Sequence, residues 1–319
     1  MKFLKFLILL TLMSCQSNES ITIGYQGMAN PWKLLIQNKS FEKITDKTLQ
    51  WKKFDSGAKV INAMASGDVD LAAMGSTPLA TAVGKDLSLQ VIWVLGIIGE
   101  SEAFVTKPGI ESFQDLKGKK IAVPFGSTCH YHLLVALEKN DIKVKDVEIY
   151  NLTPSSIVSS WKNDQVDAAF VWAPVLEEIK KTGKVLISSK DLAEKGDPTF
   201  DAFVGRKEFL KNNREFTALF LKEINQLHKK VRSEKWTETS QEVKEIASFI
   251  GSNPLDVYLA LSGYQYPLRE DQIGADLLGG GLHQALKKTS EFLKDQGKIS
   301  EVKQSFDSFV TDEYAKASE

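Results

Sequence analysis

A regular alternation of short apolar strands with helical segments constrains the fold of this chain more than any other feature. Between the strand patterns lie helical patterns, at the spacing typical of βαβ units. After about Lys207 long, amphipathic, charge-rich helices replace the alternation. The order predicts an α/β protein with a helical C-terminal segment. The predicted strands cover residues 21–25, 50–54, 71–74, 90–95, 103–106, 120–123, 148–151, 168–171 and 203–205.

An internal repeat divides the alternating part. Residues 56–78 and residues 154–174 each show a helix, a short polar turn, a buried strand and a proline-started helix. The repeat predicts two similar α/β lobes, with a ligand cleft at the carboxyl ends of their strands. We expect one lobe from residues 21–101 plus 207–319. The other contains residues 102–206, with a hinge strand at each of its ends.

The N-terminus has the pattern of a processing segment. Two lysines precede an apolar run at residues 6–13, which is too short to span a bilayer, and Ser14-Cys15 follows it. This end resembles the bacterial lipobox, in which the cysteine becomes the lipidated first residue of the mature protein. A plain secretory signal is the alternative. We expect residues 1–15 to be signal and lipidated Cys15, residues 16–20 to be a polar tether, and the protein to be exported and membrane-anchored, in the periplasm or on the outer cell surface.

Composition and motifs exclude several classes of function. The 40 basic and 41 acidic residues give a net charge of −1, which does not indicate a nucleic-acid partner. His130 and His132 are two positions apart, so they cannot share a metal ion from one helix face, and His228 and His283 are distant in sequence. Neither a metal, a cofactor nor a catalytic set is indicated, and we expect a non-enzyme. Cys129 is expected to be a buried, inert thiol.

Several helix starts suggest an anion site. Each contains Asn, Ser, Thr or Pro, which are favoured at helix N-termini, and ordinary capping alone explains such residues in most proteins. Most of these starts directly follow an apolar strand, where their free N–H groups and positive dipole ends would converge on a cleft. Hydroxyl groups there would add donors to an anion. The starts are Asn30-Pro31, Ser76-Thr77-Pro78, Ser127-Thr128, Thr153-Pro154-Ser155 and Trp172-Ala173-Pro174.

Two acids occupy matching positions in the chain. Glu102 and Asp201 each directly precede Ala-Phe-Val at the start of a short strand. Such an acid usually faces solvent. If the two strands cross between the lobes, however, the acids lie side by side, and close carboxylates repel unless a cation lies between them. The pattern therefore favours a cationic group on the ligand, and Trp172, just past a strand end, is expected to form a cleft wall.

These residues belong to a wider resemblance. The chain resembles the taurine-binding proteins of ABC importers, within the type II periplasmic-binding fold and its sulfonate, nitrate and taurine family. The resemblance covers roughly residues 21–312. The segments that carry it are 51–57, 65–69, 75–80, 101–103, 121–125, 127–128, 130–131, 171–174 and Asp201.

The resemblance implies a role for each matched residue. The sulfonate would be held by backbone N–H groups and by the hydroxyls of Ser76, Thr77, Ser127 and Thr128. The ammonium would be held by Glu102 and Asp201. Trp172 would cover the carbon chain, and Gln26 matches a Tyr-Gln pair after the first strand. It also implies a monomer that delivers its ligand to an ABC permease and its ATPase.

Some residues depart from the family pattern, and rival functions follow. Residues 27–32 replace a loop in which relatives usually carry Val and Glu before the Pro, and Cys129 replaces a common hydroxyl residue. A binding protein for alkanesulfonates would share the anion site but would not need Glu102 and Asp201. A binding protein for pyrimidine precursors of thiamine would need aromatic stacking instead, and an enzyme would need a base, nucleophile or metal in the cleft.

Overall fold

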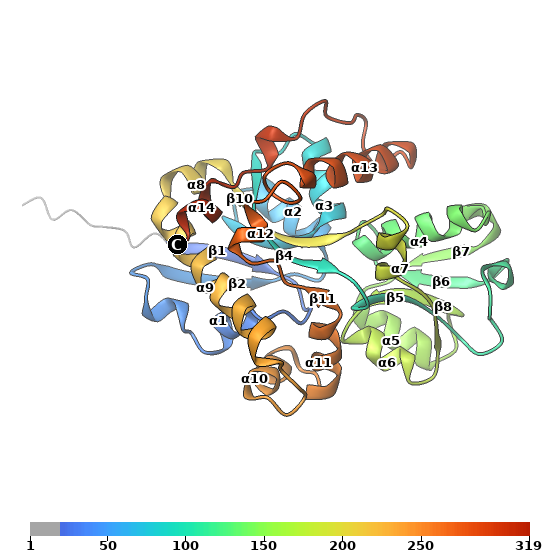
Figure 1. Cartoon of the computed structure of the whole chain (residues 1–319). Helices are drawn as coiled ribbons and strands as arrows, with labels where there is room; N and C mark the ends of the chain where they lie inside the picture. Colours follow the sequence, from blue (N-terminus) through green and yellow to red (C-terminus); the bar gives the residue numbers. More distant parts are fainter. Residues whose placement is uncertain (1–19) are drawn as a thin grey trace, which may run out of the picture.

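The computed structural model describes residues 20–319. Cys15 and the predicted lipobox lie outside the described residues. Two β-sheets organise the described chain, one in each half of the molecule (Figure 1). The first sheet has the order β11-β4-β10-β3-β1-β2. Its strands are β1 Ser20–Tyr25, β2 Thr48–Lys53, β3 Leu71–Gly75, β4 Leu89–Ile98, β10 Phe200–Arg206 and β11 Tyr264–Gln265.

The second sheet has the order β7-β6-β8-β5-β9. Its middle strands are apolar on both faces, as expected for strands covered on both sides. Phe104 and Phe170 pack on one face, while Val105 and Val171 of the same strands pack on the other. The strands are β5 Glu102–Thr106, β6 Lys120–Val123, β7 Glu148–Asn151, β8 Ala168–Trp172 and β9 Lys184–Ser188.

Both sheets have the same topology, apart from β11 at the edge of the first. In each sheet three strands are parallel (β2-β1-β3 and β7-β6-β8). In each sheet an antiparallel strand lies next to the third parallel strand: β10 beside β3, and β5 beside β8. The predicted α/β class with two similar units is therefore confirmed.

Helices surround both sheets, and the C-terminal third is mostly helical, as predicted. Within residues 20–319 no helix is long and apolar enough to cross a membrane. The helices are α1 Lys33–Gln37, α2 Gly57–Ala65, α3 Ser76–Gly84, α4 Thr128–Lys139, α5 Pro154–Lys162, α6 Val175–Lys180, α7 Ser189–Glu194, α8 Lys207–Asn212, α9 Arg214–Glu234, α10 Gln241–Ile250, α11 Pro254–Ser262, α12 Arg269–Gln272, α13 Gly281–Asp295 and α14 Glu313–Ala317, with four short 3-10 helices, η1 Phe41–Lys43, η2 Phe113–Leu116, η3 Val144–Asp146 and η4 Asp307–Phe309.

All nine predicted strands are present, and two further strands were not predicted from the sequence. β9 is a partly exposed edge strand with a weak apolar pattern. β11 has only two residues and lies among helices, where a strand signal is hard to see. Their absence from the prediction matters for the site, because β11 contributes Tyr264 to it.

The chain crosses twice between the sheets. It leaves the first sheet after Ile98 and enters the second at Glu102. It returns between α7 and β10, and β10 pairs wholly within the first sheet. The pairing favours a return crossing at residues 195–199, between α7 and β10. The division into lobes otherwise stays a prediction.

The return crossing is held from both halves of the molecule. The carboxylate of Asp197 forms two ion pairs, with Lys139 Nζ of α4 at 3.0 Å and with Lys288 Nζ of α13 at 2.7 Å. Because two cations face its carboxylate, the pKa of Asp197 is lowered despite burial. The pair with Lys288 ties α13 to the crossing segment. In Figure 1 α13 extends over the helices of the first half of the molecule toward the second half.

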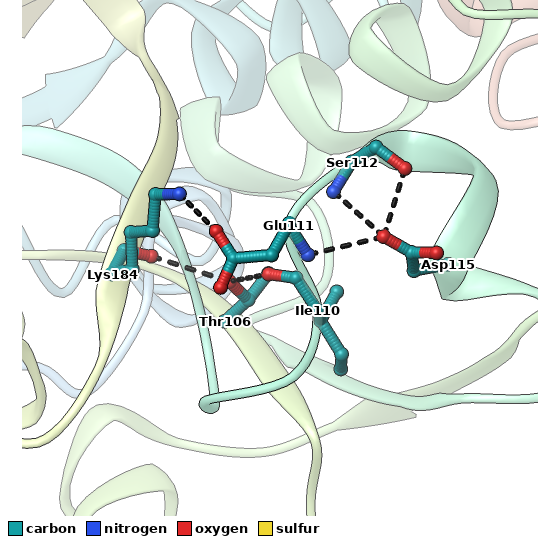
Figure 2. A network of polar contacts seen from close by, with 6 residues as sticks. All are labelled: Thr106, Ile110, Glu111, Ser112, Asp115 and Lys184. Carbon is teal, nitrogen blue, oxygen red and sulfur yellow. Dashed lines mark hydrogen bonds and ion pairs between the residues drawn. The ribbon is translucent and has the colours of Figure 1, made fainter.

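The far end of β5 is fixed by the polar network of Figure 2. Thr106 Oγ1 donates a hydrogen bond to the carbonyl of Ile110 at 3.0 Å, and Lys184 at the start of β9 pairs with Glu111. Ser112 and Asp115 form a capping box on η2. These contacts hold the strand whose other end carries Glu102.

Candidate ligand-binding site

The starts of two helices from opposite halves meet beside a buried cavity. α3 begins at Ser76 directly after β3, and α4 begins at Thr128 with Ser127 as its N-cap. Gly75 permits their approach, because a Cβ atom there would lie 2.9 Å from Thr128 Cγ2. The first N–H groups of a helix have no partner in the helical hydrogen-bond ladder. In α4 the Ser127 side chain accepts from the N–H of His130, and the N–H groups that precede His130, with those at the start of α3, are left to face an anion at this point.

The cavity brings most of the predicted site residues together. Its volume is about 20 Å³, room for about one water molecule. The two halves must therefore separate before the cavity admits a larger ligand. The residues that line it are Gln26, Met28, Gly57, Gly75, Pro78, Glu102, Ser127, Thr128, Trp172, Asp201 and Tyr264.

Glu102 opens β5 and is buried beside the start of α4. Its Oε1 accepts a hydrogen bond from Thr128 Oγ1 at 2.6 Å. Burial raises the pKa of Glu102 to about 8, and the nearby charge of Asp201 adds to the rise. A group with that pKa is mostly protonated at neutral pH.

Asp201 lies near the start of β10, opposite Gly75 of β3. Its Oδ2 accepts a hydrogen bond from Tyr264 Oη at 3.0 Å. Burial raises the pKa of Asp201 to about 6, while Tyr264 and the positive charge of Lys33 oppose the rise. The carboxyl group of Asp201 is therefore ionised at neutral pH.

Lys33 is a fully buried cation close to this acid. Its Nζ donates to the carbonyl oxygen of Gln26 at 2.8 Å and lies 4.1 Å from the ring centroids of both Tyr25 and Trp32. Burial and the positive charge of Lys53 hold the pKa of Lys33 well below its usual value, and Asp201 partly restores it. The two aromatic faces and the carboxylate offset part of the cost of a positive charge at this buried position.

The four predicted hydroxyl residues differ in what they can still donate. Ser127 donates to the carbonyl of Pro124 at 2.6 Å, and Thr128 donates to the carboxyl group described above. Ser76 and Thr77 do not line the closed cavity. Thr77 Oγ1 is buried without a partner in residues 20–319. The structure therefore points to backbone N–H groups as the main anion donors, and the predicted roles of the four hydroxyls stay predictions.

Gln26 and Trp172 lie where the sequence placed them. Trp172 ends β8, pairs with Glu102 across the sheet and lines the cavity. Gln26 follows β1, and its Oε1 lies 3.7 Å from the position of a Cβ atom on Gly57. Both side chains can contact a ligand in this cavity, and their roles also stay predictions.

Five lining residues and one neighbouring cation were missed in the sequence. Gly57, Gly75 and Pro78 lie in the repeat, where Pro78 was named as part of the helix start Ser76-Thr77-Pro78 but was given no role in the site. A Cβ atom on Gly57 would lie 2.5 Å from Pro78, so the close packing of α2 and α3 depends on this glycine. Met28, Tyr264 and Lys33 carry no local signal that separates them from ordinary core or surface residues.

The fold and the cavity together define a class of protein. Two similar α/β units, two crossings and a buried cavity between helix starts are the architecture of a two-lobed binding protein that closes on its ligand. In residues 20–319 no group of three or more potential ligands could hold a metal ion.

Comparisons with known proteins give the family. A family model described as the substrate-binding domain of the ABC-type glycine betaine transport system matches residues 19–246. The taurine-binding periplasmic protein of Escherichia coli strain K12 is 36% identical over 299 residues, which cover 93% of each chain. A putative aliphatic sulfonates-binding protein of the same strain is 29% identical over 56% of this chain and 58% of its own. This chain belongs to the family of substrate-binding proteins of ABC importers.

Solved structures show the same fold. The alkanesulfonate-binding protein of Xanthomonas axonopodis pv. citri, bound to MOPS, matches 88% of this chain and 94% of its own, with a TM-score of 0.74 and 20% identity. The periplasmic aliphatic sulphonate binding protein of Escherichia coli matches 89% of this chain and 94% of its own, with a TM-score of 0.72 and 21% identity. The predicted type II periplasmic-binding fold is confirmed.

Proposed function

We propose that this protein captures taurine between its two lobes and delivers it to an ABC permease and its ATPase. One observation carries the choice of ligand: Glu102 and Asp201 line the same buried cavity as the starts of α3 and α4. The helix starts suit a sulfonate, and the acids suit an ammonium group. The 36% identity to a taurine-binding protein of Escherichia coli supports the proposal.

Charge separates taurine from the alkanesulfonate alternative. A site of helix starts alone would leave the ammonium of a zwitterion stripped of water and unpaired, which costs several kcal/mol. Conversely, an alkanesulfonate without an amine would bury an ionised Asp201 with no ligand group to match it. The proposal therefore predicts selectivity for ligands that carry both charges.

Isothermal titration calorimetry on three small ligands tests this proposal. Taurine should bind tightly, and ethanesulfonate, which lacks the amine, should bind far more weakly. Glycine betaine should bind weakly as well, because its quaternary ammonium has no N–H to donate to the acids. Taurine should be recovered unchanged after incubation. Tighter binding of ethanesulfonate than of taurine would favour the alkanesulfonate function.

We further propose that Cys15 anchors the exported protein to a membrane, since it follows the apolar run of residues 6–13. Cys15→Ser should release the protein from the membrane fraction or block its processing. Cys129→Ser is the matched control, because it makes the same substitution at a buried site inside the folded domain. Membrane association of Cys15→Ser equal to that of wild type would contradict the anchor.

A further inference from the structure

Behind the cavity, Glu102 continues into a buried chain of polar groups. Its Oε2 lies 3.3 Å from Ser189 Oγ, which lies 2.7 Å from His132 Nδ1. His132 Nε2 in turn lies 2.8 Å from the backbone carbonyl oxygen of Asp197. The side chains of Ser189 and His132 are fully buried and do not line the cavity. Ser189 therefore cannot act as a nucleophile on a bound ligand, and another purpose has to explain the chain.

The direction of each hydrogen bond follows from the carbonyl at its end. A carbonyl oxygen only accepts, so His132 Nε2 carries a hydrogen. Burial lowers the pKa of His132 to about 4, so the ring is neutral and its Nδ1 has a free lone pair. Ser189 has one hydroxyl hydrogen, and the shorter contact of 2.7 Å directs it to His132 Nδ1. The 3.3 Å contact taken alone would fit donation from Ser189 to a carboxylate, but with its hydrogen directed to His132, Ser189 Oγ is left to accept from Glu102.

This direction places a proton on Glu102. Its Oε1 already accepts from Thr128, so the hydrogen toward Ser189 sits on Oε2. An ionised Glu102 would instead direct Oε2 at a lone pair of Ser189. The opposite distribution, with Glu102 ionised and His132 charged, requires a fully buried imidazolium beside the rings of Tyr131 and Phe170. Burial strongly disfavours that charge.

We propose that Ser189 and His132 hold Glu102 as a neutral acid in the ligand-free protein, and that capture of an ammonium group releases this proton to solvent. In the step, the Oε2–H bond of Glu102 breaks, the proton passes to water, and the carboxylate pairs with the N–H donors of the ligand. Ser189 and His132 are positioning residues, since they act through Glu102. The second half of the inference rests on taurine, or another primary amine, as the ligand.

The surrounding charges agree with this assignment. The ionised Asp201 disfavours a second negative charge on Glu102, and the positive charge of Lys33 favours the carboxylate of Asp201. Only one acid of the cavity is then charged before the ligand arrives, so the two carboxyl groups do not repel. At the Glu102 end of this series of hydrogen bonds, the other titratable groups are Cys129 and Tyr264. At the His132 end they are Tyr131 and Asp197, and Asp197 is paired with Lys139 and Lys288.

Carbon-13 NMR of labelled glutamate side chains tests the neutral acid without any ligand. In wild type, one carboxyl signal that is missing in Glu102→Gln should titrate well above the usual glutamate range. Ser189→Ala removes the acceptor of the Glu102 proton and should lower that midpoint. Ser233→Ala, an exposed serine on α9, should leave it unchanged. A Glu102 midpoint in the usual range, or one that Ser189→Ala does not lower, would overturn the proposal.

Calorimetry in buffers of different ionisation enthalpy tests the proton release. Taurine binding at pH 7 should release about one proton per ligand, and Ser189→Ala should release fewer. Taurine that binds without releasing a proton would overturn the coupling while leaving the proposed function intact. If taurine does not bind, the proposed function fails and so does the coupling to taurine, whereas the NMR titration still decides the state of Glu102.

Discussion

Glu102 and Asp201 occupy equivalent positions in two sheets of the same topology, yet their surroundings give them opposite charge states. Each lies at or near the start of the antiparallel strand beside the third parallel strand. Each also pairs with the last residue of that third strand: Glu102 with Trp172, and Asp201 with Gly75. The fold therefore delivers two matching carboxyl groups to one cavity.

The difference lies in the groups behind each acid. Asp201 receives a hydrogen bond from Tyr264 and the field of Lys33, both of which favour the carboxylate. Glu102 also receives a hydrogen bond, from Thr128, but burial raises its pKa further, and on the proposed assignment its second oxygen meets Ser189 as an acceptor, which favours the neutral acid. Topology thus fixes where the acids lie, and the neighbouring side chains decide which of them is charged before the ligand binds.

Removal of the charge at Asp201 should have the largest effect on this comparison. Asp201→Asn keeps an acceptor for Tyr264 but removes the carboxylate that is already ionised before binding, so that only Glu102, after it loses its proton, can pair with the ligand ammonium. We expect taurine binding to weaken by roughly 2–5 kcal/mol, as when one partner of a buried charge pair is truncated. Calorimetry with ethanesulfonate is the companion measurement, and its affinity should change far less.

The exposed residue Asp46 offers a matched control for this substitution. Asp46→Asn should bind both ligands like wild type. If Asp201→Asn weakens taurine and ethanesulfonate equally, Asp201 supports the fold rather than pairing with the amine.

Glu102→Gln should have a smaller effect, because glutamine imitates the neutral acid that the ligand-free protein already holds. We expect a loss of about 1–3 kcal/mol in taurine binding. In wild type, affinity should increase as pH rises toward about 8, since ionisation of Glu102 then costs less. Calorimetry from pH 6 to 8 should show that increase reduced in Glu102→Gln. If the pH dependence is the same in Glu102→Gln as in wild type, ionisation of Glu102 does not contribute to taurine binding.

Lys33→Met should alter Asp201 indirectly. Without the nearby positive charge the pKa of Asp201 should rise. As the pH is lowered, Asp201 should therefore become protonated sooner, and taurine binding should weaken at a higher pH than in wild type. A rise of one pKa unit limits the loss at low pH to about 1.4 kcal/mol. Binding curves from pH 5 to 8 measure the shift. A curve that moves toward lower pH, or does not move, would contradict the influence of Lys33 on Asp201.

Thr77→Val should have the smallest effect and concerns the anion half of the site. Its hydroxyl is buried without a partner in residues 20–319, so valine should not lower the free energy of unfolding. If the hydroxyl reaches a sulfonate when the lobes separate and close again, taurine and ethanesulfonate should lose the same affinity, about 0.5–1.5 kcal/mol. Thermal unfolding and calorimetry measure the two quantities. No loss for either ligand would leave the sulfonate to backbone N–H groups.

Much of the fold could be predicted because its signals are local. The strands of both sheets are short apolar runs, and the starts of α3 and α4 are marked by Ser76-Thr77-Pro78 and Ser127-Thr128. Glu102 and Asp201 were found because both precede the same three residues, and a repeated pattern is visible without coordinates.

Only the tertiary structure decided the charge states within the site. His132 and Ser189 are 57 positions apart, and Ser189 and Glu102 are 87 apart, so no spacing in the sequence reveals their contact. Lys33 gives no local sign of burial, since most lysines near helix starts face solvent. The sequence by itself determined two lobes, two helix starts and a pair of acids. Their protonation depends on burial and on the direction of hydrogen bonds, which exist only once distant segments are packed together.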